Sequence, residues 1–323
     1  MPEHEHADPR SAEATATAAP ARDAGVRSPV QLALTLQRSA GNAATAQLLS
    51  RFASPQARTN ATGQDDRSLG YTRFTGAVYT RAPGEDATGI AADDVKQGQL
   101  GDCYFLSPVM AVARINPRVI HRLIHGPVDT WADGTRVYDV DLYEGHWYGN
   151  RKRTFRITDR FVTAAGGGSR YAQPGDVDAS GGGEIWVMLL EKAWAALRGG
   201  YDQAHSGLMA DGITAITGND TDDQEISGRS DERIWRDISG ACRDGKPVTI
   251  STKDTFTADE LFEAEDIEYT MVAGHAYNVA RVDPEWQTID IMNPHGRNHL
   301  IGFPLVRVRR FFDWYTIGER SLR

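Results

Sequence analysis

The distribution of apolar residues divides the chain into a polar first part and a body with regular patterns. Residues 1–27 are rich in Ala, Pro, Thr and charge and contain almost no large apolar side chain, which predicts disorder. Residues 28–50 carry apolar residues at roughly helical spacing after a Ser-Pro start, which predicts a helix. The stretch that follows is rich in Gly, Thr, Asp and Pro. We therefore expect a disordered, partly helical leader and linker over residues 1–69 and a folded body over residues 70–323.

The body changes from helical to strand-like patterns along its length. Three segments have the apolar pattern of helices: residues 103–115, 184–198 and 231–243. The alternation typical of strands occurs at residues 136–143, 247–251, 275–282 and 288–292. The order, mainly helices and then mainly strands, predicts an α+β fold. Its helical half is expected over about residues 70–225 and its sheet half over about residues 226–323.

Composition and charge narrow the class of protein. The 323 residues are enough for one large or two small domains, and 40% hydrophobic residues are ordinary for a soluble globular protein. A net charge of −9 argues against nucleic-acid binding and is compatible with a protein that binds a divalent cation. The sequence shows neither an apolar stretch long enough to span a membrane nor a secretory signal. We expect a monomer that is cytoplasmic in the producing cell.

Cys103 lies where a glycine-bearing loop meets an apolar helix. The loop of residues 97–103 reads Gln-Gly-Gln-Leu-Gly-Asp-Cys. A helix N-terminus carries about half a positive charge, which stabilises a thiolate and lowers the pKa of a cysteine placed there. Backbone N–H groups at this position, together with the side-chain amide of Gln97, are suited to hold a developing oxyanion. The competing interpretation is a buried structural cysteine that happens to begin a helix.

Two later segments favour the catalytic interpretation of this cysteine. His275 begins an apolar strand, and Asn293 ends the next strand along the chain. The order Cys, His, Asn is that of the triad in papain-like cysteine proteases. In that triad His275 accepts the thiol proton, which gives a thiolate–imidazolium pair, and Asn293 orients the imidazole ring. Alone, His275 would more often be an ordinary core residue.

Several motifs in the body resemble the calpain family of cysteine proteases. They are the cysteine motif at residues 97–103, residues 186–193 with Gly200-Tyr201, Thr217-Gly218, Gly274-His275-Ala276-Tyr277, and Asn293-Pro294. The resemblance covers roughly residues 75–317. It implies a papain-like fold with two lobes, in which a helical lobe carries the cysteine and an antiparallel sheet lobe carries the histidine and asparagine.

The same resemblance implies substrate contacts and shows one departure. Gly207 and Gly274 fall where calpains hold the backbone of the peptide substrate, and glycine there lets a strand approach closely. Calpains usually have Trp after the Asn-Pro pair, where it shields the hydrogen bond between His and Asn. This chain has His295 at that position. We therefore expect the hydrogen bond between His275 and Asn293 to be more exposed to water and the two side chains to be less tightly held.

A calcium site is implied by the resemblance and not by the pattern itself. The ligands of one calpain site map to Ala87, Gly89, Asp94 and Glu184. Carbonyl and carboxylate oxygens are the ligands that calcium prefers. The loop of the second calpain site is missing, and the arginine that couples the two sites is Ala92 here, so we expect one site at most. Alternatively, Asp94 and Glu184 are helix-capping acids.

Residues 36–44 resemble a short segment near the N-termini of proteins that bacterial contractile injection systems carry. This likeness implies that residues 28–50 bind an injection particle and that the protein is an exported effector or toxin. An ordinary amphipathic helix is the alternative.

Three functions remain open at this point. The leading hypothesis is an active endopeptidase that acts on a protein substrate. The others are a catalytically inactive binding module with the calpain fold, and a papain-fold acyltransferase or transglutaminase that uses the same triad.

Overall fold

The computed structural model of the protein describes residues 69–81, 85, 87–145, 149–177, 181–257, 260 and 271–323. The helix expected at residues 28–50, and the disorder expected before it, lie outside this described part of the chain. Within the described part, no helix is long and apolar enough to cross a membrane.

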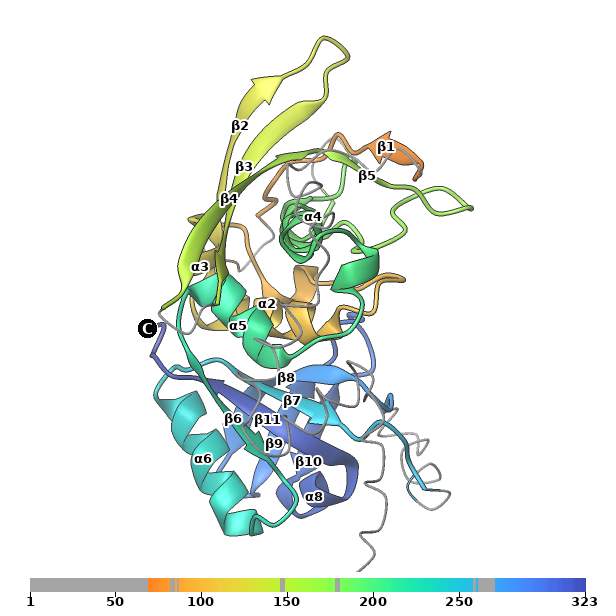
Figure 1. Cartoon of the computed structure of the whole chain (residues 1–323). Coiled ribbons are helices and arrows are strands. Elements are labelled where there is room, and N and C mark those ends of the chain that lie inside the picture. Colours follow the sequence, from red (N-terminus) through yellow and green to blue (C-terminus); the bar gives the residue numbers. More distant parts are fainter. Residues whose placement is uncertain are drawn as a thin grey trace, which may run out of the picture.

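In the part of the chain that the structure describes, the first lobe combines four α-helices with a protruding sheet (Figure 1). Its helices are α2 (Cys103–Ile115), α3 (Pro117–His121), α4 (Trp186–Arg198) and α5 (Met209–Thr217). Its three-stranded antiparallel sheet consists of β2 (Ile124–Thr130), β3 (Arg136–Glu144) and β4 (Arg151–Thr158), and a separate pair consists of β1 (Tyr71–Arg73) and β5 (Arg160–Val162). Helix α2 is apolar nearly all round because it lies inside the lobe, where residues 104–113 are all buried.

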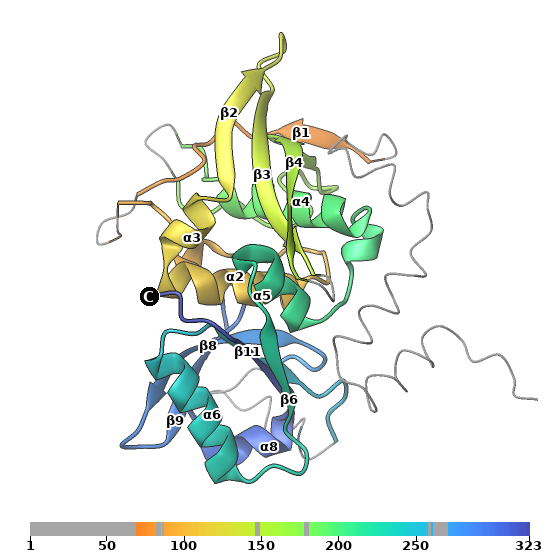
Figure 2. The same cartoon turned by 60° about the vertical axis from the view of Figure 1, so that its left-hand side comes forward.

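The second lobe is a six-stranded antiparallel sheet with the order β10-β9-β8-β7-β11-β6. The strands are β6 (Thr221–Glu225), β7 (Val248–Thr252), β8 (Ala276–Asp283), β9 (Thr288–Met292), β10 (Leu300–Pro304) and β11 (Phe312–Gly318). Figure 2 shows α6 (Asp231–Arg243) lying along this sheet, with the short helix α8 (Val308–Phe311) at its lower end. Ile234 and Ile238 of α6 are buried against it.

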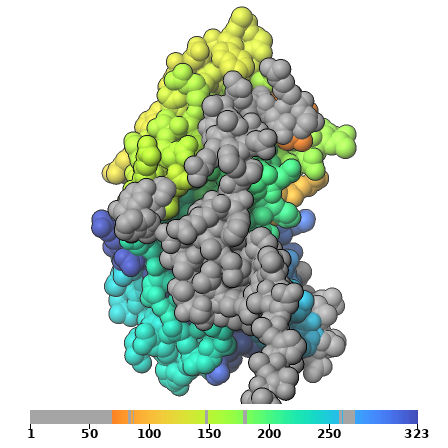
Figure 3. Space-filling model, in the orientation of Figure 1, coloured from red at the N-terminus to blue at the C-terminus, as the bar shows by residue number. Residues whose placement is uncertain are grey.

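Each lobe has its own hydrophobic core, and the two lobes meet where α2 packs against β8. Successive residues of β8 divide between the cores, since Ala276 belongs to the first core and Tyr277 to the second. The space-filling view in Figure 3 shows the first lobe above the second. The C-terminus returns to the first lobe, where Asn116 Nδ2 donates a hydrogen bond of 2.6 Å to the carbonyl of Leu322.

The predicted elements are found at nearly the predicted positions. Helices α2 and α6 have the predicted bounds, and α4 begins at Trp186, after Glu184. Strands β3, β7, β8 and β9 match their predictions within a residue. The helical half contains more sheet than predicted, because β2 and β4 flank β3 there. The mixed α+β class, with helices first and antiparallel strands later, is confirmed.

Candidate active site

Cys103 is the first residue of α2, at the junction of the two lobes. Its Sγ accepts a hydrogen bond of 3.5 Å from the backbone N–H of Ala276, which is the first residue of β8. The cysteine of the first lobe is therefore in direct contact with the strand that follows His275.

His275 and Asn293 are buried together beside this cysteine. His275 Nε2 and Asn293 Oδ1 are 3.0 Å apart, and the backbone N–H of His295 donates to the same oxygen at 2.9 Å. An oxygen that accepts from a backbone N–H must also accept from the imidazole, so Nε2 carries the proton. This tautomer leaves Nδ1 of His275 free of a proton and able to take one from the thiol.

Two aromatic rings enclose the His275 imidazole. His295 stacks on it with ring centres 4.5 Å apart, and Tyr277 meets it edge-on at 4.7 Å. The His275 side chain is consequently buried, with the residue 5% exposed. The sequence predicted a pair more exposed to water because His295 stands in place of Trp, yet in the structure both His275 and Asn293 are buried.

Burial sets the protonation of the pair in the free protein. It raises the pKa of the Cys103 thiol to about 11, although the N–H of Ala276 lowers it. It also lowers the pKa of His275 to about 4. The sequence predicted a lowered thiol pKa from the helix N-terminus. Backbone amides do act in that direction, but the loss of solvation is the larger effect, so the resting pair is a neutral thiol and a neutral imidazole.

Gln97 lies on the loop that leads to Cys103. Its Nε2 donates a hydrogen bond of 2.7 Å to the carbonyl of Leu100, and its backbone N–H donates to the carbonyl of Pro294 at 2.8 Å. The Gln97 side chain also hydrogen-bonds the carboxyl group of Asp102, the residue before the nucleophile. The bond to Pro294 ties this loop to the segment that follows Asn293.

The two predicted substrate glycines lie at the surface near the cysteine. A Cβ on Gly207 would come within 2.4 Å of the Tyr104 ring, so this position is small because it packs over the residue after the nucleophile. Gly274 has a φ of +61°, which favours glycine, and it directly precedes His275. Both positions leave backbone accessible near the triad.

Two buried groups beside the triad were not predicted from the sequence. Asp102 and Glu191 are 0% and 2% exposed, and their carboxyl groups are in contact. Both Glu191 oxygens accept from the N–H of Ala172, at 2.9 and 3.0 Å, whereas burial and Glu191 hold the pKa of Asp102 well above its usual range. A negative charge on Asp102 raises the pKa of the neighbouring Cys103 thiol, so the raised pKa of Asp102 acts against that charge.

His299 is a third group that the sequence did not predict. Its Nδ1 accepts a hydrogen bond of 3.0 Å from the backbone N–H of Asn293, so it fixes the backbone of Asn293. Glu191 lies within the 186–193 motif, but that motif gave no role for it, and His299 lies just before β10, outside every motif.

Asp94 and Glu184, two of the four predicted calcium ligands, lie side by side. Both are buried, and Trp186 Nε1–H is 3.2 Å from Asp94 Oδ2 and from Glu184 Oε1. Burial raises the pKa of Glu184 to about 9, with Asp94 adding to the effect. Asp94 Oδ2 also accepts from the N–H of Ala91 at 2.6 Å, so it caps η2 (Ala92–Asp94) as the alternative interpretation holds.

The structure adds two carboxylates that the sequence did not predict as ligands. Oxygen atoms of Glu85, Asp94 and Asp176 all lie within 4.8 Å of one another. The other two predicted ligands, Ala87 and Gly89, lie in the turn between Glu85 and η2. A set of carboxylates and loop carbonyls fits a hard divalent cation such as calcium.

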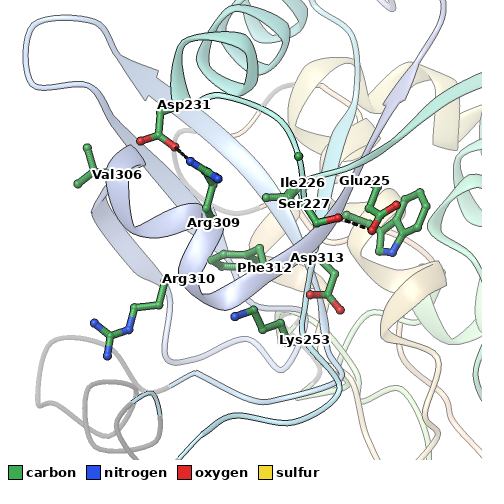
Figure 4. Close-up of a pocket in the computed structure, with 12 residues that line it drawn as sticks. Glu225, Ile226, Ser227, Asp231, Lys253, Val306, Arg309, Arg310, Phe312 and Asp313 are labelled. Carbon is green, nitrogen blue, oxygen red and sulfur yellow. Dashed lines mark hydrogen bonds and ion pairs between the residues drawn. The ribbon is translucent and has the colours of Figure 1, made fainter.

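One cavity lies away from these residues. It has a volume of about 700 Å³ and lies in the second lobe, next to α8 and the start of β11 (Figure 4). Its charged groups are largely paired, since Arg309 is 3.8 Å from Asp231 and Lys253 is 2.7 Å from Glu260. A second cavity, of about 500 Å³, includes Gln97 and His295 and therefore lies at the triad.

Comparison with known proteins identifies the family. Residues 77–304 match the model of the calpain family cysteine proteases. The chain belongs to the calpain family. It is 28% identical over 245 residues to rat (Rattus norvegicus) calpain-8, a match that covers 74% of this chain and 32% of that protein. It is 25% identical over 218 residues to the bovine (Bos taurus) calpain-1 catalytic subunit, with 64% of this chain and 28% of that protein covered.

The match also extends to plants. The calpain-type cysteine protease DEK1 of Zea mays is 25% identical over 202 residues, which are 60% of this chain and 8% of DEK1. The chain thus spans about a third or less of the length of these relatives. What is shared is the cysteine peptidase domain, which is the domain of a hydrolase.

Proposed function

We propose that the protein is a cysteine endopeptidase that hydrolyses peptide bonds in proteins through Cys103, His275 and Asn293. The observation that carries the proposal is the hydrogen-bonded pair of His275 and Asn293, together with the contact of Cys103 Sγ with the backbone N–H of Ala276, the residue after His275. The calpain-family domain supports it.

In the proposed mechanism, the Cys103 thiol passes its proton to His275 Nδ1 as the sulfur attacks the scissile carbonyl. The carbonyl oxygen takes up negative charge and receives hydrogen bonds from the N–H groups at the start of α2 and from Gln97 Nε2. When the tetrahedral intermediate collapses, the C–N bond breaks and His275 gives its proton to the leaving amine. Water then attacks the thioester carbonyl with His275 as base, which releases the acid and restores the thiol.

An acyltransferase would use the same first half-reaction and then pass the acyl group to an amine. The test is product analysis by mass spectrometry of a protein digest in ¹⁸O water, with a primary amine added. Hydrolysis incorporates ¹⁸O at new C-termini and supports the proposal, whereas amide products in place of acids would favour the acyltransferase. Delivery of the protein by an injection particle, through residues 28–50, stays a prediction.

Activity is expected to persist into acidic solution. His275 must be uncharged to accept the thiol proton, and burial lowers its pKa from 6.5 to about 4. The value of kcat/KM should therefore hold as the pH falls through 6.5 and decline only as it approaches 4. A pH profile on a peptide substrate measures this, and a half-maximal point near 6.5 would contradict it. The His295→Phe variant keeps a ring stacked on His275 but removes the second imidazole. If the decline of kcat/KM at low pH is unchanged in this variant, the decline is assigned to His275.

We also propose that one calcium ion binds at Asp94 and Glu184, with Glu85 and Asp176 as further carboxylates. Added calcium is expected to raise both activity and melting temperature along a hyperbolic curve, because it neutralises buried acids just before the loop of Gln97. Asp94→Asn and Glu184→Gln should weaken both responses, and Asp93→Asn, which changes an exposed neighbour, should not. Full activity in chelator, with no thermal shift on adding calcium, would contradict the proposal.

The calcium response should depend on pH through Glu184. Its folded pKa, about 9, lies above the ordinary value of 4.5, so its contribution to stability is complete below 4.5 and is lost as the pH rises toward 9. Since calcium must displace this proton, its affinity should increase over the same range. Glu184→Gln should remove both trends.

A further inference from the structure

The cavity at the triad has walls from both lobes. Its volume is about 500 Å³, and it is lined by residues 96–98, Gln173 and residues 295–297. Residues 96–98 belong to the loop that leads to Cys103, and residues 295–297 follow Asn293 between β9 and β10. The cavity is therefore a continuation of the active site.

Hydrogen bonds hold these walls in place. Besides the bond from Gln97 N–H to the Pro294 carbonyl, the N–H of Gln173 donates to the carbonyl of Lys96 at 2.8 Å. Gln173 is fixed in turn, because its Nε2 donates to the carbonyls of Ser169 and Tyr171 at 2.9 and 2.7 Å. The cavity is thus a preformed feature of the backbone.

The charged side chains of this cavity are all basic. Lys96 is half-buried and Arg297 is exposed, and no carboxylate is among the lining residues. Neither cation forms an ion pair with any residue in the described part of the chain. Gly296, with a φ of +73°, makes room for the lysine stem, because a Cβ there would lie 3.0 Å from Lys96 Cγ.

The position of this cavity relative to the scissile bond follows from the role of His275 in protonating the leaving amine. His275 gives its proton to the leaving amine, so the substrate residues that follow the cleaved bond pass the imidazole. His295 is stacked on that imidazole and lines the cavity. The residues on the leaving side of the substrate consequently reach the cavity between His295 and Gln97.

We propose that this cavity is a subsite for an acidic side chain on the leaving side of the substrate, bound by Lys96 and Arg297. The inference rests on the proposed endopeptidase function and names its substrate class, namely protein segments with Asp or Glu just after the cleaved bond. A carboxylate there forms charge-assisted hydrogen bonds with both cations, which are among the stronger contacts a protein makes.

The test uses quenched fluorescent peptides that differ only in Glu, Gln or Lys at the first and second positions after the cleaved bond. The full-length protein is expected to cleave the best Glu peptide about tenfold faster in kcat/KM than its Gln counterpart, mostly through KM, as a single charge-assisted contact allows. Lys96→Glu and Arg297→Glu should each remove this preference and favour the Lys peptide. Arg320→Glu, at an exposed arginine outside the cavity, is the matched control.

A peptide-binding measurement tests the proposed subsite independently of catalysis. The Cys103→Ala protein should bind the Glu peptide more tightly than the Gln peptide by fluorescence polarisation, and adding Lys96→Glu should abolish the difference. Equal binding and cleavage of the Glu and Gln peptides would overturn the inference, as would a preference for acid before the cleaved bond. Selective binding without cleavage by the wild-type protein would support the subsite while counting against the endopeptidase function.

Discussion

Replacing Cys103 by alanine is expected to lower peptide hydrolysis by at least about 10⁴-fold while the protein stays folded, since removing the nucleophile of a triad has effects of that order. The sulfur accepts a long hydrogen bond of 3.5 Å from Ala276, and Cys103 is only partly buried at the edge of the first core, so the loss of one atom disturbs the packing little. The measurement is kcat/KM on a peptide substrate, with the melting temperature recorded for the same preparation.

The second cysteine supplies the matched control. Cys242 lies in α6 and is also partly buried, but its thiol is remote from His275 in the sequence and in the fold. Cys242→Ser should therefore retain activity. Near-normal hydrolysis by Cys103→Ala would refute the mechanism, and loss of activity in a folded Cys242→Ser protein would mean that the wrong thiol was chosen.

His275 and Asn293 are expected to differ in how much activity they support. His275→Ala removes the group that accepts and returns the proton, so its loss should approach that of the cysteine variant. Asn293→Ala removes only the acceptor that orients the ring, and His295 stacked at 4.5 Å still restrains the imidazole. We expect Asn293→Ala to retain about a hundredfold more activity than His275→Ala, in line with the smaller effect of the orienting residue in other triads.

Single-turnover rates of acylation, measured at saturating substrate, separate this orienting role from a binding defect. The Asn293→Ala protein should form the acyl-enzyme slowly with little change in substrate affinity. Equal losses in the two variants, in proteins of unchanged melting temperature, would show that Asn293 does more than orient the ring.

The elements that the sequence predicted are those with a strong periodic signal. Helix α4 and strand β8 bury apolar residues at regular spacing, so the apolar pattern alone predicts each element. Helix α5 contains Gly212 and several β-branched residues, which disfavour helix, and it forms because it packs tightly on α2. Strand β6 reads Thr-Asp-Asp-Gln-Glu and has no apolar pattern, so its pairing with β11 at the sheet edge was not predictable.

The candidate site likewise contains some residues that the sequence predicts and others that it does not. Cys103, His275 and Asn293 occupy motifs whose order along the chain signals their chemistry. The sequence predicted a lowered pKa for the Cys103 thiol, because the helix N-terminus is visible in the sequence, whereas the depth of burial that raises this pKa is not. Glu85, Asp176 and His299 reach the site through loops and an edge strand, and no spacing rule connects them to their partners.

The buried contact between Asp102 and Glu191 also limits how this protein can change over time. A neutral substitute for Glu191 alone removes a partner of the buried Asp102 carboxyl, directly before the nucleophile. A substitute for Asp102 alone leaves a buried carboxylate whose remaining hydrogen bonds come from the Ala172 amide. Either single step is costly, and a change of both avoids the cost when the new residue at position 191 still accepts from the buried Ala172 N–H. Residues far apart in the chain are thereby expected to evolve as a pair, and a library that varies only one of them would miss the functional combinations.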